Sequence, residues 1–409
     1  MESSSKSKSF TFLGAVLIAA GTSIGAGMLA LPVLTGLAGF WPAVSIYLIS
    51  WLIVTYASLV LLEINLTMGY EANLLTMAKS TLGPTGKVIA FLTYIFLFYS
   101  VSVAYLAVSG SLITNLLDVI FKTNLQNWVG ISLSLLLYVP ALYSGTRVVA
   151  NTNFFLVIGI VISYVLLILL GAKYINMDYL MHTNWKYSLM GIPVIATSFT
   201  FQNVIPSLTT YLKRDLILLK WVIILGGLIP LVIYVIWEWF VLGLVPVQGE
   251  LSIQSLLKEG QPASFALQSI IQSKSVITFS QTFAFCAIAT SYLGVILSLF
   301  DFLADGFKIE KSGKGKLILC AFIFIPPFIM AVLFPKIFLN ALSYAGSFGC
   351  VTLFIILPAL MAWSSRYRHK IKRSFQVLGG KLALSLMLIL GIAVITLQFL
   401  LTFKVVNPL

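Results

Sequence analysis

Long apolar segments separated by short polar tracts dominate this chain and restrict the fold that it can adopt. Eleven such segments lie roughly at residues 11–35, 40–63, 87–117, 127–144, 148–171, 190–211, 217–244, 275–303, 316–335, 338–362 and 381–403. Each approaches the roughly 20 residues that a helix needs to cross a bilayer. Hydrophobic residues make up 60% of the chain and charged residues only 9%, which excludes an ordinary soluble domain. The sequence therefore predicts an all-α polytopic membrane protein with eleven transmembrane helices.

The basic residues set the expected orientation. With the N-terminus inside, 18 of the 25 lysines and arginines fall in inside loops and 7 in outside loops, and cytoplasmic loops attract such an excess. We therefore expect the N-terminus in and the C-terminus out. The same clustering accounts for the net charge of +13 without nucleic acid as a partner. The first apolar run continues through Pro32 and is too long for the apolar region of a signal peptide, so it is expected to remain as a span.

The first segment contains a feature that a plain membrane helix does not need. Residues 21–27, Gly-Thr-Ser-Ile-Gly-Ala-Gly, fall at its centre, and each glycine weakens a helix by roughly 1 kcal/mol relative to alanine. A break at this depth leaves backbone N–H and C=O groups unpaired, which is tolerated only inside protein or beside a wet cavity. The alternative is close helix packing, because Gly21 and Gly25 have small-xxx-small spacing.

A second interruption favours a broken helix over packing alone. The sixth segment has a polar centre at residues 197–203, followed by Pro206, which removes a backbone donor. The two interrupted segments open two sets of five spans, and corresponding spans are displaced by about 180 to 190 residues, within the usual error of such boundaries. Because five is odd, the two sets have opposite orientation. Such an inverted repeat predicts a transporter with its binding site at the interruptions.

This repeat divides the chain into five parts. They are a cytoplasmic N-terminal tail at 1–10, a first five-helix repeat at 11–175, an inverted second five-helix repeat at 190–362, a basic cytoplasmic loop at 363–380, and an eleventh helix with the C-terminus at 381–409. Residues 64–86 are expected to form a short helix on the cytoplasmic face, and residues 248–272 to cover the entry path from outside. Plain surface loops are the alternative for both.

Other classes of protein find little support in the sequence. The three cysteines stand far apart inside apolar segments and are expected to be small core residues. Both histidines fall in loops, so neither a metal site nor a cofactor is expected. An intramembrane enzyme would need a nucleophile with a base, or metal ligands, at mid-membrane. A channel would favour repeated filter loops or charged rings, which this pattern lacks.

Three motifs resemble one family of bacterial membrane proteins. They are AGTSIGAGMLALP at 20–32, Thr197-Ser198-Phe199 with Pro206-Ser207-Leu208 and Tyr211, and ATSYLG at 289–294 with Leu299-Phe300-Asp301 and Leu303-Ala304-Asp305. They are similar to the first, sixth and eighth spans of the tryptophan/tyrosine permeases, the hydroxy and aromatic amino acid permease family. The resemblance covers nearly the whole chain. One departure is Gln202-Asn203, where it implies a small residue or a His-Gly pair.

The resemblance implies a leucine-transporter-type 5+5 inverted repeat plus one extra helix, within the amino acid–polyamine–organocation superfamily. It also implies a multi-pass protein of the bacterial cytoplasmic membrane that imports tyrosine or tryptophan by proton symport. The expected partners are an aromatic amino acid, a coupling ion and the lipid bilayer, and we expect a monomer. A sodium-coupled symporter or an exchanger of the same fold remains the alternative.

An amino acid substrate carries an anionic and a cationic group, and the breaks suit both. Free N–H groups near Ala26 to Met28, at the positive end of a half-helix, suit the carboxylate. Carbonyls freed near Ala19 to Gly21 and Thr197 to Phe199 suit the ammonium. The full set of expected substrate-binding residues is Ala20, Gly21, Thr22, Ser23, Gly25, Ala26, Gly27, Met28, Tyr99, Ser102, Thr197, Phe199, Thr200, Phe201, Gln202 and Asn203, with Tyr94, Phe98 and Phe283 as further candidates for the aromatic slot.

The coupling ion has candidates of two kinds. Carboxylates inside a membrane are functional candidates by default. Glu63 and Asp301 fall at span ends, where pairing with Arg147 or a loop lysine is expected, and Asp118 is also at an end. Glu238 lies deeper and is the first candidate for a proton carrier. Thr290 and Ser291 of the eighth span offer hydroxyls that would suit Na⁺ together with first-span carbonyls.

Overall fold

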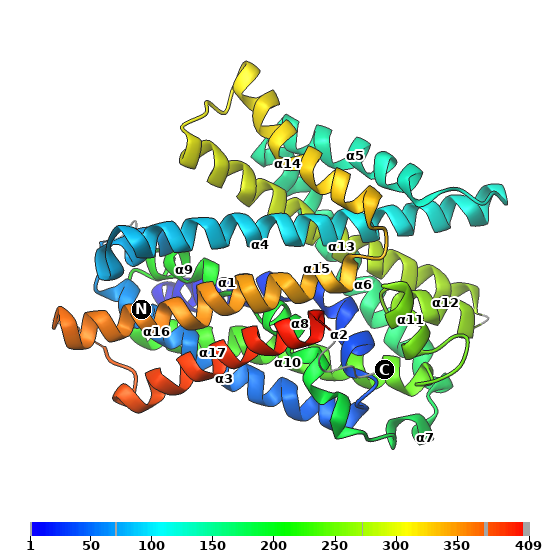
Figure 1. Cartoon of the computed structure of the whole chain (residues 1–409), viewed down its shortest axis with the longest axis horizontal. Coiled ribbons are helices and arrows are strands. Elements are labelled where there is room, and N and C mark those ends of the chain that lie inside the picture. The colour runs from blue at the N-terminus through cyan, green and yellow to red at the C-terminus, as the bar shows by residue number, and fades with distance from the viewer. Residues whose placement is uncertain (1, 70–71, 272, 372–374, 404–409) are drawn as a thin grey trace.

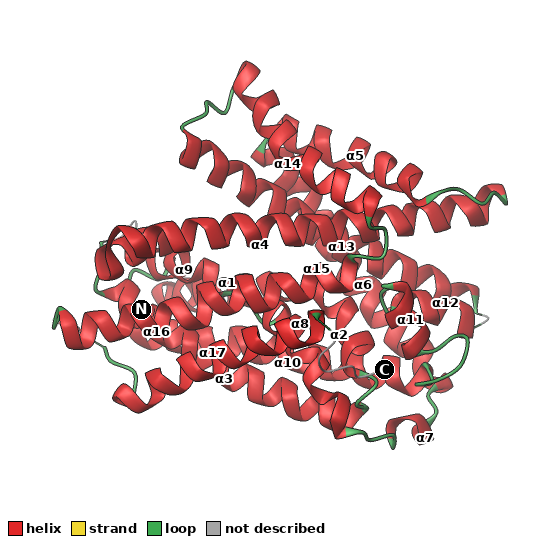
Figure 2. Cartoon of the chain, in the orientation of Figure 1, coloured by secondary structure: helices red, strands yellow, loops and turns green. Residues whose placement is uncertain are grey.

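The computed structural model describes residues 2–69, 72–271, 273–371 and 375–403, and it is helical throughout with no strand in these ranges. Figure 2 shows the helices joined by short loops. The all-α prediction is thus confirmed. Parts of the expected basic loop and of the C-terminus, residues 372–374 and 404–409, lie outside the described residues.

The helices follow the apolar segments closely. The first part of the chain forms α1 (Glu2–Ser23), α2 (Gly27–Thr35), α3 (Phe40–Leu66), α4 (Leu74–Phe121), α5 (Asn127–Ser144), α6 (Thr146–Gly171) and the short η1 (Ala172–Tyr174), α7 (Met177–Leu180) and η2 (Trp185–Gly191). The second part forms α8 (Ile192–Ser198), η3 (Gln202–Val204), α9 (Ile205–Tyr211), α10 (Leu216–Leu244), α11 (Ile253–Glu259), α12 (Ser264–Ile270), α13 (Lys274–Phe307), α14 (Gly313–Leu333), α15 (Phe338–Tyr344), η4 (Ala345–Cys350), η5 (Thr352–Ile356), α16 (Leu357–Trp363), η6 (Ser364–Arg368) and α17 (Gly380–Thr402).

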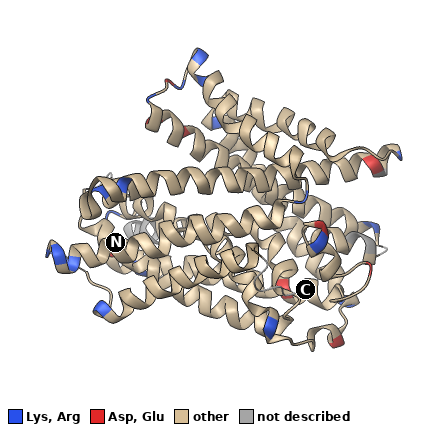
Figure 3. Ribbon diagram, viewed as in Figure 1, with Lys and Arg blue, Asp and Glu red and all other residues tan. Residues whose placement is uncertain are grey.

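Ten helical segments of the described residues are long and apolar enough to cross a membrane. The pair Thr11–Ser23 and Gly27–Thr35 passes the same test together, and it is bent by 53°. In Figure 1, α17 lies beside α16. Figure 3 shows lysines and arginines mainly near the ends of helices, with long uncharged stretches between them. This distribution agrees with a multi-pass membrane protein, whereas the inverted repeat and the orientation stay predictions.

The break in the first segment separates α1 from α2. Residues 24–26 are not helical, as expected from the glycines on either side. A Cβ on Gly21 would meet nothing within 4 Å, so the pair Gly21 and Gly25 is not a helix-packing motif. Gly25 and Gly27 do pack closely, because a Cβ on Gly25 would collide with the Ser291 hydroxyl and a Cβ on Gly27 would lie 2.8 Å from the Ser198 Oγ. The broken-helix prediction is confirmed, and two of its glycines also permit close packing.

The second interruption separates α8 from η3 and α9. The helix ends at Ser198, three non-helical residues follow at 199–201, and a single turn of 3₁₀-helix leads into α9. Pro206 was expected to interrupt this segment. It lies instead in the first turn of α9, where the missing N–H would have no helical partner anyway. The proline therefore starts the second half-helix, and the break precedes it.

Both long loops contain helices, and a helix was expected in the first of them. α4 begins at Leu74 and bends at Gly83, whose φ of 77° lies in the region that favours glycine. The stretch before this bend is the predicted short helix of residues 64–86. The loop at 248–272 carries α11 and α12, and the N–H of Ala263 donates a 3.2 Å hydrogen bond to the carbonyl of Leu29 in α2. This loop is therefore attached to the half-helix that follows the first break.

The packing of the helices brings the two breaks to the interior. α10 packs against α1 and α3, α8 packs against α2 and η4, and α13 packs against α4 and α6. All three cysteines are free and buried, as predicted. One expected ion pair is wrong: Glu63 pairs with Arg366 rather than with Arg147. The reason is topological, because η6 brings Arg366 to the end of α3, where Oε1 of Glu63 accepts a 2.8 Å hydrogen bond from Nε.

Candidate functional site

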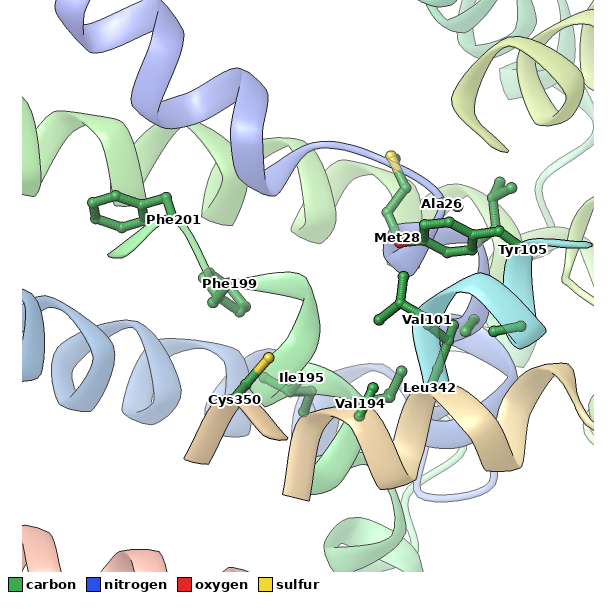
Figure 4. Packing of buried hydrophobic residues seen from close by; sticks show 14 of the residues in the cluster. Ala26, Met28, Val101, Tyr105, Val194, Ile195, Phe199, Phe201, Leu342 and Cys350 are labelled. Atoms are coloured by element: carbon green, nitrogen blue, oxygen red, sulfur yellow. The ribbon is translucent and has the colours of Figure 1, made fainter. Parts of the chain in front are cut away.

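The two breaks face each other. The start of α2 packs against the end of α8, and the 2.8 Å approach of a Cβ on Gly27 to the Ser198 Oγ shows how close they lie. Figure 4 shows Ala26 and Met28 of the first break on one side, Phe199 and Phe201 of the second on another, and Val101 and Tyr105 of α4 between the neighbouring helices. Ala26, Met28, Phe199 and Phe201 are each at most 1% exposed. The breaks therefore form a buried wall on two sides of one region.

The N–H groups of the first break are only partly used. The Ala26 N–H donates a 2.9 Å hydrogen bond to the Ser291 hydroxyl of α13, and the Met28 N–H donates to the Gly25 carbonyl at 3.1 Å. The N–H groups of Gly25 and Gly27 have no hydrogen-bond partner within the described part of the chain. Two donors thus remain at the positive end of α2, although Ala26 is not one of them.

The carbonyl end of the first break lies two residues beyond its expected place. The prediction put it at Ala19 to Gly21, but α1 continues to Ser23, and the Ala20 carbonyl accepts the Ile24 N–H within the helix at 3.0 Å. The last carbonyl, that of Ser23, lies 2.7 Å from the hydroxyl of Tyr234 in α10. The same hydroxyl lies 2.7 Å from the Ser198 carbonyl at the end of α8. Tyr234 therefore joins the ends of both half-helices.

Two hydroxyls that the sequence predicts for the site are buried without partners. Ser23 Oγ and Ser102 Oγ find no hydrogen-bond partner among the described residues. Their side chains belong to residues 6% and 0% exposed. A buried polar group without a partner costs free energy, about 1 to 3 kcal/mol for a hydroxyl or amide. Such groups are compatible with a polar ligand that completes their hydrogen bonds.

Four predicted residues are less enclosed than the others or are held by another helix. Gly21, Thr22 and Asn203 are exposed, and the Thr22 hydroxyl donates back to the Ile18 carbonyl of its own helix at 2.7 Å. The Tyr99 hydroxyl donates to the Phe322 carbonyl of α14 at 2.7 Å. Tyr99 is half-buried and its hydroxyl is held by α14, whereas Ser102 of the same helix is fully buried.

The other polar residues of the second break hold the backbone in place. The Gln202 Oε1 accepts the Phe201 N–H at 3.1 Å. The hydroxyls of Thr197 and Thr200 donate to the carbonyls of Leu342 and Ala196 at 3.0 and 2.6 Å. These side chains satisfy backbone groups that the break would leave unpaired. Gln202 is therefore a structural support of the break in this conformation.

Aromatic rings line the region unevenly. The Phe199 ring lies 5.1 Å from the Tyr234 ring, edge to face, and 6.3 Å from the Tyr47 ring. Tyr94 and Phe98 stack with each other and contact Phe302 of α13. The third further candidate, Phe283, packs against Tyr164 and Trp237. Of the predicted aromatic residues, Phe199 has the most direct contact with the breaks.

Glu238 is completely buried, and its partners are hydroxyls. The Thr35 hydroxyl lies 2.6 Å from Oε1 and the Tyr47 hydroxyl 2.7 Å from Oε2. Thr35 also lies 2.7 Å from the Leu31 carbonyl. These three contacts need three hydrogens, and the two hydroxyls supply two. A proton on the carboxyl itself would supply the third. No lysine, arginine or histidine of the described residues forms an ion pair with Glu238.

The remaining acidic candidates have structural partners. Asp301 pairs with Lys311 at 2.7 Å, as expected for a loop lysine, and this hydrogen bond raises the pKa of Lys311. Asp118 accepts the Leu125 N–H at 2.9 Å and closes a turn. In α13, the Thr290 and Ser291 hydroxyls both donate to the Ala287 carbonyl. Only Ser291 of these two reaches the first break.

Four residues of this region were not anticipated. They are Thr35, Tyr47, Tyr105 and Tyr234. Tyr234 stands four residues before Glu238, so both lie on one face of α10, and this spacing is a signal that sequence reasoning could have used. Tyr105 stands three residues after Ser102, and Figure 4 shows it beside Ala26 of the first break. No local sequence pattern points to Thr35 or Tyr47, because their role depends on how α2 and α3 meet α10.

Several known transport proteins are similar to this chain over nearly its whole length. The "Tyrosine-specific transport system 1" of Haemophilus influenzae is 30% identical over 393 residues, which is 95% of this chain and 96% of that protein. The "Low affinity tryptophan permease" of Escherichia coli K12 is 32% identical over 98% of this chain and 97% of its own length. The "Tryptophan-specific transport protein" of Haemophilus influenzae is 31% identical over 96% of both. These relatives are transporters rather than enzymes.

The match to a family extends over almost the whole sequence. Residues 8–398 match the profile of the tryptophan/tyrosine permease family. The matched range includes both breaks, the Tyr234 contacts and Glu238. This agrees with the resemblance seen in the three sequence motifs, and it makes the chain a multi-pass membrane transporter. The chain belongs to the tryptophan/tyrosine permease family.

Proposed function

We propose that this protein imports tyrosine, tryptophan or both across a bacterial cytoplasmic membrane, by proton symport with alternating access. The observation that carries the proposal is the meeting of two broken helices around unpaired polar groups. Relatives that cover the whole chain are named for tyrosine and for tryptophan transport, which supports the substrate class. All of those named above are bacterial, which supports the membrane.

The substrate carboxylate has a site at the start of α2. The N–H groups of Gly25 and Gly27 remain without partners in the described ranges, and the positive end of a helix dipole favours an anion by about 0.3 to 1 kcal/mol. The two glycines lack side chains that would cover these donors. The substrate carboxylate would therefore bind to main-chain groups of the first break, without a basic side chain.

The aromatic part of the substrate has a polar contact in Ser102. This hydroxyl is buried on α4 and has no partner among the described residues. A phenol hydroxyl or an indole N–H could complete its hydrogen bond, while the ring packs near Phe199. A site built around such a bond rejects an analogue that lacks it more strongly than an apolar pocket does. This residue therefore favours tyrosine and tryptophan over phenylalanine.

The coupling ion that the site supports best is a proton on Glu238. The carboxyl is buried, forms no ion pair with a basic residue of the described part of the chain, and has contacts to which its own proton would supply the third hydrogen. It bridges α10 to Thr35 at the end of α2 and to Tyr47 of α3. Glu63 differs in kind, because its charge is neutralised by Arg366. Protonation of Glu238 would thus change the contacts of a half-helix that also binds substrate.

The sodium alternative has weaker support. It relied on Thr290 and Ser291 facing carbonyls of the first span. The Ser291 oxygen instead accepts the Ala26 N–H and donates to the Ala287 carbonyl, and the Thr290 hydroxyl donates within its own helix. A hydroxyl that accepts from an N–H in this way has less to offer a cation.

Uptake into proteoliposomes tests the proposal. Purified protein is reconstituted, and uptake of labelled tyrosine and tryptophan is followed after a proton gradient or a sodium gradient is imposed. We expect accumulation of at least one of the two with the proton gradient alone, inhibited by the other and less by phenylalanine. Folded, reconstituted protein that transports neither amino acid under any gradient would refute the substrate class. Accumulation that requires sodium would refute the coupling ion.

A further inference from the structure

Three oxygen atoms converge where the ends of the two half-helices meet. The Tyr234 Oη lies 2.7 Å from the Ser23 carbonyl oxygen and 2.7 Å from the Ser198 carbonyl oxygen. Carbonyl oxygens only accept hydrogen bonds, and the phenol carries a single hydrogen. Two contacts of hydrogen-bond length therefore share one hydrogen. The group of oxygens is one donor short, and it presents partial negative charge from three sides.

The surroundings hold these oxygens in place and supply no further donor. Tyr234 is fully buried, and Ser23 and Ser198 are 6% and 2% exposed. The edge-to-face contact with Phe199 at 5.1 Å fixes the orientation of the Tyr234 ring. The Ser198 hydroxyl donates to the Val194 carbonyl of its own helix at 3.0 Å. The Ser23 hydroxyl is the nearby group without a partner among the described residues, and as an alcohol it has one hydrogen to give.

We propose that Tyr234 is a substrate-binding residue whose hydroxyl, with the Ser23 and Ser198 carbonyls, binds the substrate amine. An alkylammonium has three N–H donors and a positive charge, so it supplies both the missing hydrogens and the charge. This inference rests on the proposed function and adds to it a residue of α10, a helix outside the breaks. Because the phenol contacts both half-helices, amine binding joins α1, α8 and α10 at a single point.

The conservative variant Tyr234→Phe tests the proposal. It keeps the ring and its contact with Phe199 and removes only the hydroxyl. Tyr164→Phe is the matched control, because the Tyr164 hydroxyl also donates to a backbone carbonyl of α10, that of Ile233, at 3.0 Å. We expect Tyr234→Phe to raise the KM for tyrosine or tryptophan about tenfold, with little change in Vmax per folded molecule. Tyr164→Phe should change KM less than twofold. An unchanged KM in Tyr234→Phe would overturn the proposal.

A second measurement separates amine binding from a structural effect. Binding of the amino acid and of its N-methyl derivative is compared in wild type and in Tyr234→Phe, as a double-mutant cycle between protein and ligand. If the hydroxyl faces the amine, the fold loss of affinity on N-methylation should be at least three times smaller in the variant than in wild type. If the two losses simply multiply, the hydroxyl does not face the amine, and the proposal fails even where KM has risen.

A sodium ion is the other cation that three oxygens could bind. Binding is therefore repeated with sodium replaced by choline. We expect the effect of Tyr234→Phe to be the same in both salts. An effect that disappears without sodium would assign the oxygens to the ion and overturn the amine assignment. Failure of the proposed function appears differently, because wild type itself would then bind and transport neither aromatic amino acid.

Discussion

The hydroxyl of Thr35 lies 2.6 Å from Oε1 of Glu238, and this contact ties the last residue of α2 to the buried face of α10. α2 begins beside the first break at Gly27, eight residues earlier. One turn before Glu238 on α10, Tyr234 contacts the other side of that break. α10 is therefore linked to the end of α1 by the phenol of Tyr234 and to the end of α2 by the carboxyl of Glu238. This pair of contacts relates the proposed proton site to the proposed substrate site.

Glu238→Gln should separate exchange from accumulation. The amide has a similar size, and its oxygen can accept from one of the Thr35 and Tyr47 hydroxyls while its NH2 group donates to the other, but it cannot take up and release a proton. We expect accumulation of substrate driven by a proton gradient to fall at least tenfold, while counterflow of labelled against unlabelled substrate continues. Both are measured in proteoliposomes at several pH values. An unchanged pH dependence in this variant would remove Glu238 as the proton carrier.

Glu63→Gln should affect stability instead. The carboxylate pairs with the buried Arg366 and also accepts the Val377 N–H at 2.8 Å. Leaving a buried guanidinium without its counter-charge costs about 3 to 5 kcal/mol. We expect a lower unfolding temperature in detergent, partly recovered in Glu63→Gln/Arg366→Met. The protein that remains folded should keep its coupling to protons, in contrast to Glu238→Gln, and loss of coupling at normal stability would contradict this assignment.

Gly27→Val should block transport and leave membrane insertion intact. A Cβ at Gly27 would lie 2.8 Å from the Ser198 Oγ and 3.4 Å from its Cα, so a larger side chain separates the two half-helices. We expect uptake to fall at least tenfold with normal amounts of protein in the membrane. Gly21→Ala is the control, because a Cβ there meets nothing within 4 Å, and its uptake should stay within twofold of wild type. Normal uptake by Gly27→Val would place the site elsewhere.

Ser102→Ala should alter selectivity. Removing its unpartnered hydroxyl is expected to weaken binding of tyrosine or tryptophan by about 1 kcal/mol, or about fivefold, and to leave phenylalanine unaffected. Ser109→Ala is the control on the same helix, because its hydroxyl is already paired with that of Tyr138 at 3.0 Å. Competition uptake with the three amino acids measures the effect. Equal loss for all three would mean that Ser102 does not contact the polar end of the substrate.

The sequence alone was enough to predict the apolar helices and the two breaks. Apolar length predicts the spans, and the glycines around residue 24 predict a bend that the structure places at 24–26. The sequence could not predict the contacts that close the site, because they depend on which helices meet. Glu63 was assigned the wrong arginine because Arg366 is 303 positions away in the chain. Tyr234 was missed because a tyrosine in an apolar span is usually a core residue.

Several hydroxyl and amide side chains that the sequence predicts to contact the substrate have backbone partners in the structure. Polar residues at a break were expected to face the substrate. Thr197, Thr200 and Gln202 instead serve the backbone around them, since a broken helix in an apolar interior must first satisfy its own N–H and C=O groups. Only a hydroxyl without such a local partner, as at Ser23 and Ser102, remains available. Sequence shows which residues are polar, but it does not show which of them are already paired.

Measuring proton movement during transport tests proton symport through Glu238 most directly. Proteoliposomes are loaded with a pH-sensitive dye, and tyrosine or tryptophan is added outside in sodium-free buffer with no gradient imposed. If Glu238 carries the coupling proton, uptake acidifies the interior in wild type, and Glu238→Gln exchanges substrate without any acidification. Uptake by wild type with no change in internal pH, or equal acidification in Glu238→Gln, would contradict it.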